Sequence, residues 1–173
     1  MKPTVTELIS LLDKPALLKW ANKIGLQGIN IDDYKKQSFS KGNLYHNQIE
    51  NYIKNNIPFT DNAFYNRFKF FIHDKEILSC EENIENEYYR GRYDIKIKFN
   101  DCVYICDFKT NHKNLYFENM LQLSAYKFAN DCQKLAIISV PDFSIFEIDI
   151  NKYEICKDIL INLSNIYNLK KKL

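Results

Sequence analysis

The residues best suited to chemistry are concentrated between positions 89 and 126 of this 173-residue sequence. Asp107 and Lys109 end an otherwise apolar run, and side chains two positions apart on a strand point to the same side. A second carboxylate, Asp94, precedes this run. Charges at the end of an apolar strand cost free energy unless something pairs them. The pattern is consistent with a structural salt bridge and, alternatively, with a divalent cation held by the two aspartates beside the lysine.

The cation alternative fits the residue types. Hard cations such as magnesium favour carboxylate oxygens, keep several waters and are completed by substrate phosphates. Such a site lowers the pKa of a bound water and offsets the charge that develops on a phosphodiester. A helix expected over Glu118–Asn130 favours this interpretation, because Gln122 and Tyr126 are four residues apart and share one helical face. A second polar group is therefore expected near the two aspartates.

A β-hairpin is the element that would bring the aspartates together. Residues 94–99 alternate polar and apolar side chains, which is the period of a half-buried strand. Asn100-Asp101 is a two-residue turn signal, and the mostly apolar run Cys102–Thr110 follows it. If this run returns antiparallel, the first aspartate lies across from the region of the second, at the end of the hairpin far from its turn.

Three short motifs follow one another along this stretch: Gly91-x-x-Asp94, Asp107-Phe108-Lys109-Thr110 and Gln122-x-x-x-Tyr126. Together they resemble the successive motifs of the RecB-like branch of the PD-(D/E)XK nuclease superfamily, and in particular the mitochondrial genome maintenance exonucleases and their small phage and bacterial relatives. The resemblance implies an α/β, restriction-endonuclease-like fold, in which a mixed central β-sheet is flanked by helices. It also implies metal-dependent hydrolysis of phosphodiester bonds in DNA.

The resemblance also implies roles for single residues. A site for Mg²⁺ or Mn²⁺ would be formed by His46, Asp94, Asp107 and the backbone carbonyl of Phe108. Lys109 would act with the two aspartates in catalysis, orienting and helping to deprotonate the attacking water and opposing the developing negative charge. The substrate would be contacted by Gln122, Tyr126, Thr110 and Arg92.

His46 belongs to a helix expected over Ser40–Asn55, close to its apolar stripe. By itself such a histidine is more often a partly buried side chain than a ligand. Lys41-Gly42-x-x-x-His46, however, resembles the helix of RecB-like nucleases that donates a histidine to the metal. A neutral imidazole adds coordination without adding negative charge to a site that already holds two carboxylates.

Several other polar residues near the motifs have two interpretations each. Glu81 is a candidate extra carboxylate, but Glu82 stands beside it and a solvated strand end is an equal alternative. Gly91 allows close backbone approach, either to packing or to nucleic acid. Phosphate contacts are expected from Arg90, Arg92 and Lys113, and His112 could at most approach substrate from its loop.

The remaining elements follow from apolar periodicity and capping signals. We predict helices from Glu7 to Leu12 with Thr6 as N-cap, from Pro15 to about Gly25, from Asp61 to Asp74 and from Asn151 to Leu169. Further strands are expected over Glu76–Asn83, Lys134–Val140 and Ser144–Ile150. All of these fit one domain over residues 1–173, with a helical part (1–75), a catalytic sheet and helix (76–150) and a C-terminal helix (151–173).

Composition limits the partners and the compartment. The formal net charge of +2 is modest, so any groove for nucleic acid must be local. The five cysteines form no C-x-x-C pair and are interpreted as reduced, mostly buried thiols of a cytoplasmic protein. The iron–sulfur cluster of CRISPR-associated RecB-like nucleases is not expected, because no cysteine precedes Cys80. No signal peptide is visible and no apolar run approaches the ~20 residues of a membrane span, so no membrane partner is expected.

The expected function is therefore that of an exonuclease acting on single-stranded DNA or DNA ends. Two alternatives are kept. One is an endonuclease that depends on DNA structure or sequence and serves in defence or restriction. The other is a nucleic-acid-binding module that keeps the fold without turnover.

Overall fold

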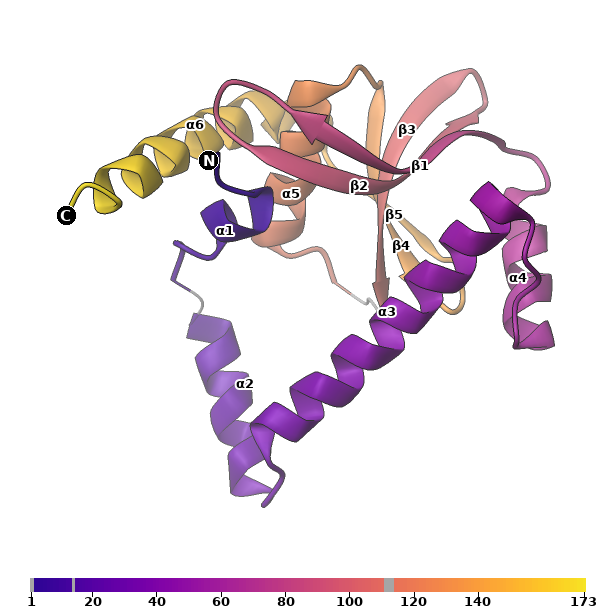
Figure 1. Cartoon of the computed structure of the whole chain (residues 1–173), viewed down its shortest axis with the longest axis horizontal. Coiled ribbons are helices and arrows are strands. Elements are labelled where there is room, and N and C mark those ends of the chain that lie inside the picture. Colours follow the sequence, from indigo (N-terminus) through magenta and orange to yellow (C-terminus); the bar gives the residue numbers. More distant parts are fainter. Residues whose placement is uncertain (1, 14, 111–113) are drawn as a thin grey trace.

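The computed structural model describes residues 2–13, 15–110 and 114–173 (Figure 1). Within these ranges the centre of the molecule is a five-stranded sheet with the order β1-β2-β3-β4-β5. Its strands are β1 (Glu76–Glu85), β2 (Arg90–Phe99), β3 (Cys102–Thr110), β4 (Lys134–Val140) and β5 (Ile145–Glu147). The first three pair antiparallel, β4 is parallel to β3, and β5 is antiparallel to β4. The predicted α/β class with a mixed central sheet is confirmed.

Helices cover both faces of this sheet. They are α1 (Val5–Ile9), α2 (Pro15–Leu26), α3 (Ile31–Asn55), α4 (Asn62–Ile72), α5 (Phe117–Ala129) and α6 (Tyr153–Lys170), with a short 3₁₀ turn η1 (Ile150–Lys152) before the last. Helices α1, α5 and α6 pack on one face around Ile105 and Ile137, whereas α4 and the second half of α3 pack on the other around Cys106 and Ile138. Strands β3 and β4 are thus buried on both faces, which explains their nearly continuous apolar sequences.

The hairpin between β2 and β3 forms as predicted. Phe99 pairs with Cys102, and the register continues to the pair Ile95–Cys106. The two turn residues both have positive φ, +47° at Asn100 and +58° at Asp101. Asparagine and aspartate tolerate this left-handed conformation better than other residues with a side chain, and it matches the twist of the flanking strands.

Element boundaries differ from the sequence predictions where a cap was misplaced. The first helix begins at Val5 rather than Glu7, because Thr4, not Thr6, is the N-cap and forms a capping box with Glu7. The predicted helix over Ser40–Asn55 begins at Ile31, where Asn30 accepts hydrogen bonds from the next turn.

The C-terminal part also differs in its boundaries. The strand predicted over Ser144–Ile150 is limited to Ile145–Glu147. Asp149 then caps η1, and the closing helix begins at Tyr153 rather than Asn151.

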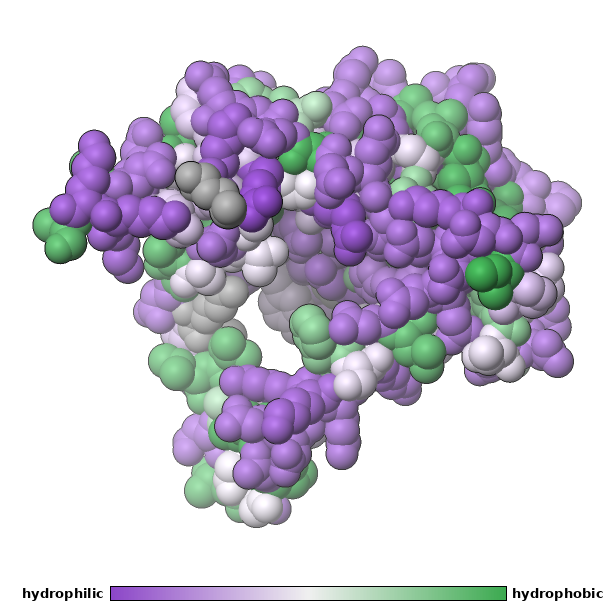
Figure 2. All heavy atoms as spheres, in the orientation of Figure 1, coloured by the Kyte–Doolittle hydropathy of each residue, from purple (hydrophilic) through white to green (hydrophobic). Residues whose placement is uncertain are grey.

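Helix α2 and the first half of α3 project from the body of the molecule (Figure 1). Figure 2 shows an opening between this projection and the body. Only the second half of α3 packs against the sheet, through residues such as Ile49. A search of the described helices found none with the length and apolar character needed to cross a bilayer.

Candidate metal centre

Asp94 lies in the middle of β2, at a point where the strand changes face. Tyr93 belongs to the core on the α5 side and Ile95 to the core on the α4 side, although residues two apart normally share a face. On the neighbouring strand, Glu81 has φ +50°, in the left-handed region. The strand pairs Cys80–Ile95 and Glu82–Tyr93 flank these two acids, which therefore lie opposite each other at a local irregularity.

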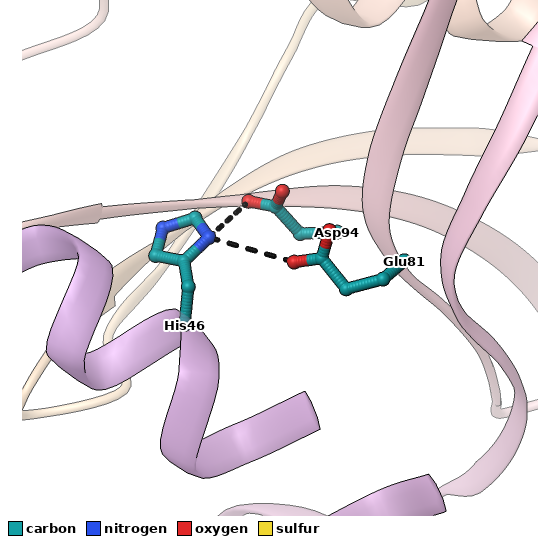
Figure 3. A group of neighbouring side chains, drawn as sticks. All are labelled: His46, Glu81 and Asp94. Carbon is teal, nitrogen blue, oxygen red and sulfur yellow. Dashed lines mark ion pairs between the residues drawn. The ribbon is translucent and has the colours of Figure 1, made fainter. Parts of the chain in front are cut away.

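Three potential ligands converge at this irregularity (Figure 3). One ligand atom each from His46, Glu81 and Asp94 lies within 4.8 Å of the other two. His46 Nδ1 is 3.6 Å from Asp94 Oδ2 and 3.7 Å from Glu81 Oε1. The other ring nitrogen, Nε2, is 3.2 Å from the carbonyl oxygen of Phe108. The helix α3 thus places an imidazole beside the carboxylates and the backbone carbonyl predicted as its co-ligand.

The structure distinguishes the two glutamates that the sequence left ambiguous. The Glu81 side chain is only 4% exposed and belongs to the convergent group, so it is not a solvated strand end. Glu82 is exposed and accepts a hydrogen bond from the hydroxyl of Tyr93. The positive φ of Glu81 turns the chain at this point, and no sequence pattern indicated it.

A second chain of polar contacts begins at Asp107. Its Oδ2 forms an ion pair with Lys109 Nζ at 2.6 Å, as expected for residues that share a strand face. Lys109 Nζ also donates to Gln122 Oε1 at 3.1 Å, and Gln122 Nε2 donates to the Tyr126 hydroxyl at 2.8 Å. The predicted helical face of Gln122 and Tyr126 therefore meets Asp107 and Lys109. Asp107 turns toward this lysine and is not one of the three grouped ligands.

The two groups are joined through the backbone of β3. The amide of Phe108 donates to Asp94 Oδ2 at 2.6 Å, while its ring is buried on the α4 side of the sheet. Asp107 and Lys109 point to the opposite, α5 side. The tripeptide Asp107–Lys109 of β3 therefore connects the imidazole and carboxylate group to the lysine chain.

Burial and neighbouring carboxylates shift the pKa values of three groups in the site. Burial and, after it, the charge of Asp107 raise the pKa of Asp94 to about 8. Burial lowers the pKa of His46, but a hydrogen bond with Glu81 and the charge of Asp94 outweigh burial, and the net pKa is raised. Burial likewise lowers the pKa of Lys109, and the charge of Asp107 more than compensates. Each shift is in the direction that adds or retains a proton near the carboxylates.

These groups are of types that ligate divalent cations. Carboxylate and carbonyl oxygens suit hard cations, whereas an imidazole is more usual at transition-metal sites. Asp107 Oδ2 is buried and forms an ion pair with the ammonium of Lys109. The geometry of this contact is not that of a hydrogen bond, so the oxygen has no hydrogen-bond partner among the described residues. A cation near Asp94 would compensate the charge that now raises the pKa of that carboxyl.

A groove of about 860 Å³ opens over these side chains. Among the predicted site residues it is lined by His46, Asp94, Asp107, Lys109, Gln122, Tyr126 and Arg92. Thr110 is not part of this lining and packs against α3, where its Oγ1 lies 3.4 Å from the position of a Cβ built on Gly42. The expected hydrogen bond from Thr110 to phosphate is therefore not supported by its position.

The flanking residues have distinct placements. Arg92 Nε pairs with Glu81 Oε2 at 2.8 Å while more than half of its side chain stays exposed. A Cβ on Gly91 would lie 3.0 Å from Val5 Cγ2 and 3.2 Å from Tyr126 Cε1, so this glycine allows close packing. His112 and Lys113 lie outside the described residues.

One exposed aromatic residue in the groove lining had no motif to indicate it. Phe39 lies on α3 and lines the groove together with His46. The available signal was spacing, because the two residues are seven apart, about two helical turns, and so share one face.

No protein-family model matches the sequence, and a search of curated proteins finds no match. A search of solved structures finds, among others, the crystal structure of SSO0001. The two share 17% sequence identity with a TM-score of 0.45, and the alignment covers 94% of this chain and 76% of that one.

Proposed function

We propose that this chain is a divalent-metal-dependent deoxyribonuclease that hydrolyses phosphodiester bonds, acting on single-stranded DNA or on DNA ends. One observation carries the proposal. The Asp107–Lys109 ion pair lies on the same strand segment whose backbone binds Asp94 and faces His46. A group that suits a cation and a group that suits a phosphate thus share one groove.

In this proposal His46, Glu81 and Asp94 would hold Mg²⁺ or Mn²⁺, with Asp107 and the Phe108 carbonyl, the other expected ligands, beside them. Such an ion, when bound, lowers the pKa of a coordinated water and neutralises phosphate charge. Asp94 and Asp107 each lie one residue beyond the last β2–β3 pair, Ile95–Cys106, and the amide of Phe108 donates to Asp94 and holds its carboxylate in place.

Lys109 would act as a donor of hydrogen bonds and positive charge. Burial lowers the pKa of Lys109 and the charge of Asp107 raises it more, so the direction of the net shift favours the ammonium form. As an ammonium it would orient the attacking water or a phosphate oxygen and oppose the charge that develops in the transition state. Its expected help in deprotonating that water stays a prediction. Gln122 holds this ammonium in place, and Tyr126 holds Gln122 in turn.

The test is cleavage of end-labelled single-stranded and double-stranded DNA in magnesium, manganese or EDTA. We expect cleavage that requires the ion and begins at the ends. Cleavage of a circular single strand would instead favour the endonuclease alternative, and binding of DNA without any metal-dependent cleavage would favour the silent module. Equal cleavage in EDTA would remove the proposed chemistry.

A further inference from the structure

The groove lining includes the apolar side chains of Val5, Ile84 and Phe39, of which the first two are buried in the core and Phe39 is not. Phe39 is 72% exposed, and none of the aromatic contacts among the described residues involves its ring. A single exposed apolar side chain is common on protein surfaces. What distinguishes this one is that it shares a helical face with His46 and borders the same groove.

The surroundings of Phe39 on the side away from the metal centre are basic and aromatic. It borders two further shallow hollows, one lined with Lys35, Lys36 and Ser40, the other with Lys35, Trp20 and Tyr34. Phe39 therefore lies between the catalytic groove and a pair of lysines on the projecting half of α3.

These groups are of the kinds that bind a nucleic acid strand. Single strands bind along positively charged grooves in which aromatic side chains stack on successive bases. Lys109 and Phe39 line the same groove. If a phosphate binds at Lys109, the nucleotides attached to it would lie along the α3 side of this groove, where Phe39 is exposed.

Building on the nuclease function proposed above, we propose that Phe39 stacks on an unpaired nucleobase close to the scissile phosphate, and that Lys35 and Lys36 bind backbone phosphates beyond it. In a duplex the base faces are covered by neighbouring base pairs, so this contact selects single-stranded DNA.

The test is binding, measured separately from cleavage. Fluorescence anisotropy in EDTA would follow a labelled oligothymidylate of about 20 nucleotides, which is longer than one such site. We expect Phe39→Ala to raise the Kd about 5- to 150-fold, the cost of one lost stacking contact. Phe39→Trp should keep the wild-type Kd, because it keeps an aromatic face.

Phe70→Ala is the matched control. Phe70 is also a highly exposed phenylalanine on a helix, but it lies on α4 and lines a different hollow. We expect this variant to bind the strand as wild type does. Circular dichroism should show unchanged folding for both variants, because neither ring belongs to a buried core cluster.

Two further readouts separate stacking from a general loss of binding. An abasic strand of the same length should bind wild type and Phe39→Ala equally, because it offers no base to stack on. The salt dependence of binding should be unchanged in Phe39→Ala and shallower in a Lys35→Ala, Lys36→Ala double variant, because only the lysines release counterions.

Equal binding of the oligothymidylate by Phe39→Ala and wild type would overturn the stacking inference, as would absence of binding by wild type. Neither result decides the nuclease function, which depends on the metal-dependent cleavage assay. Conversely, a protein that stacks the strand through Phe39 but never cleaves it would keep this inference and lose the proposed function.

Discussion

The two ends of the β2–β3 hairpin use charged residues in opposite ways. At the turn end, Lys98 and Asp101 lie 3.9 Å apart and both are largely exposed to solvent. At the open end, Asp94 and Asp107 are buried, and Lys109 contacts the second of them at 2.6 Å. The same pair of strands thus carries a solvated ion pair at one end and a desolvated charge cluster at the other.

The two ends therefore differ in how much free energy their charges cost the folded protein. Exposed ion pairs contribute little free energy, and their residues can change without consequence for the fold. Buried carboxylates are costly, and those of the open end are contacted both from nearby and from a distant element, Asp107 by Lys109 of its own strand and Asp94 by His46 of α3. A cluster that costs stability and lines a groove is expected where a ligand compensates its charge.

The largest expected effect comes from removing the lysine of the open end. Lys109→Ala should lower metal-dependent DNA cleavage by about 10²- to 10³-fold, because it removes a preorganised positive charge from the transition state. Lys98→Ala, on the same hairpin, is the matched control and should cleave at the wild-type rate. The measurement is the initial rate on end-labelled single-stranded DNA, with circular dichroism to confirm folding of both variants. Unimpaired cleavage by Lys109→Ala would contradict the assignment of the open end as catalytic.

The next effect is the response of stability to metal. At about 100 times its Kd, Mn²⁺ should raise the free energy of unfolding by about 2.7 kcal/mol. For a chain of this size that corresponds to an increase in Tm of roughly 5–11 °C. Asp94→Asn should lose this increase, whereas Asp101→Asn, which changes an exposed carboxylate at the turn end, should keep it. The measurement is the Tm of each variant with Mn²⁺ and with EDTA. An equal Mn²⁺-induced increase in Tm in both variants would show that the ion binds away from Asp94.

The metal-free protein should also lose stability as the pH rises. The folded-state pKa of Asp94 is raised to about 8 from an ordinary value near 3.8, and that of His46 is raised as well. A raised folded-state pKa contributes stability that is fully present below the unfolded pKa and is lost as the pH passes through the folded pKa. Melts in EDTA should therefore show a Tm that falls between about pH 4 and pH 8.

Asp94→Asn tests the source of that pH dependence. The variant should have a flatter profile and a higher Tm than wild type near pH 8, because it no longer has to bury a carboxylate beside Asp107 and Glu81. The remaining slope would come from His46. A wild-type Tm that rises over this interval would show that the cluster is already neutralised without metal.

The same contrast explains how much could be predicted from the sequence. The turn, the strand period and the shared face of Asp107 and Lys109 are local properties, and the structure has all of them. The resemblance to RecB-like nucleases added His46, whose position depends on a helix that is distant in sequence. Whether the site is a nuclease site remains a prediction.

What the sequence missed depends on contacts that no local pattern encodes. Glu81 is buried because its positive φ breaks the regular strand opposite Asp94. Strict alternation would have put Glu81 and the buried Cys80 on opposite faces of the sheet, so it gave no sign that both are buried. Phe39 was missed because α3 was predicted to begin at Ser40, and the true start at Ile31 depends on the cap formed by Asn30. Misplacing one cap therefore removed the helical face that carries the proposed base contact.

The smallest expected effect is at the turn itself. Asp101 has φ +58°. This left-handed conformation is unfavourable for residues that have a Cβ atom, whereas glycine adopts it freely. Asp101→Gly creates the Asn-Gly sequence preferred in such two-residue turns and loses only an exposed ion pair. Glycine also raises the conformational entropy of the unfolded chain, which offsets about 0.4–1 kcal/mol of this relief. We expect a net gain of at most about 1 kcal/mol in the free energy of unfolding, measured by urea denaturation. DNA cleavage and the Mn²⁺-induced shift in Tm should stay unchanged, because the buried cluster at the opposite end of the hairpin does not depend on how tightly its turn is formed.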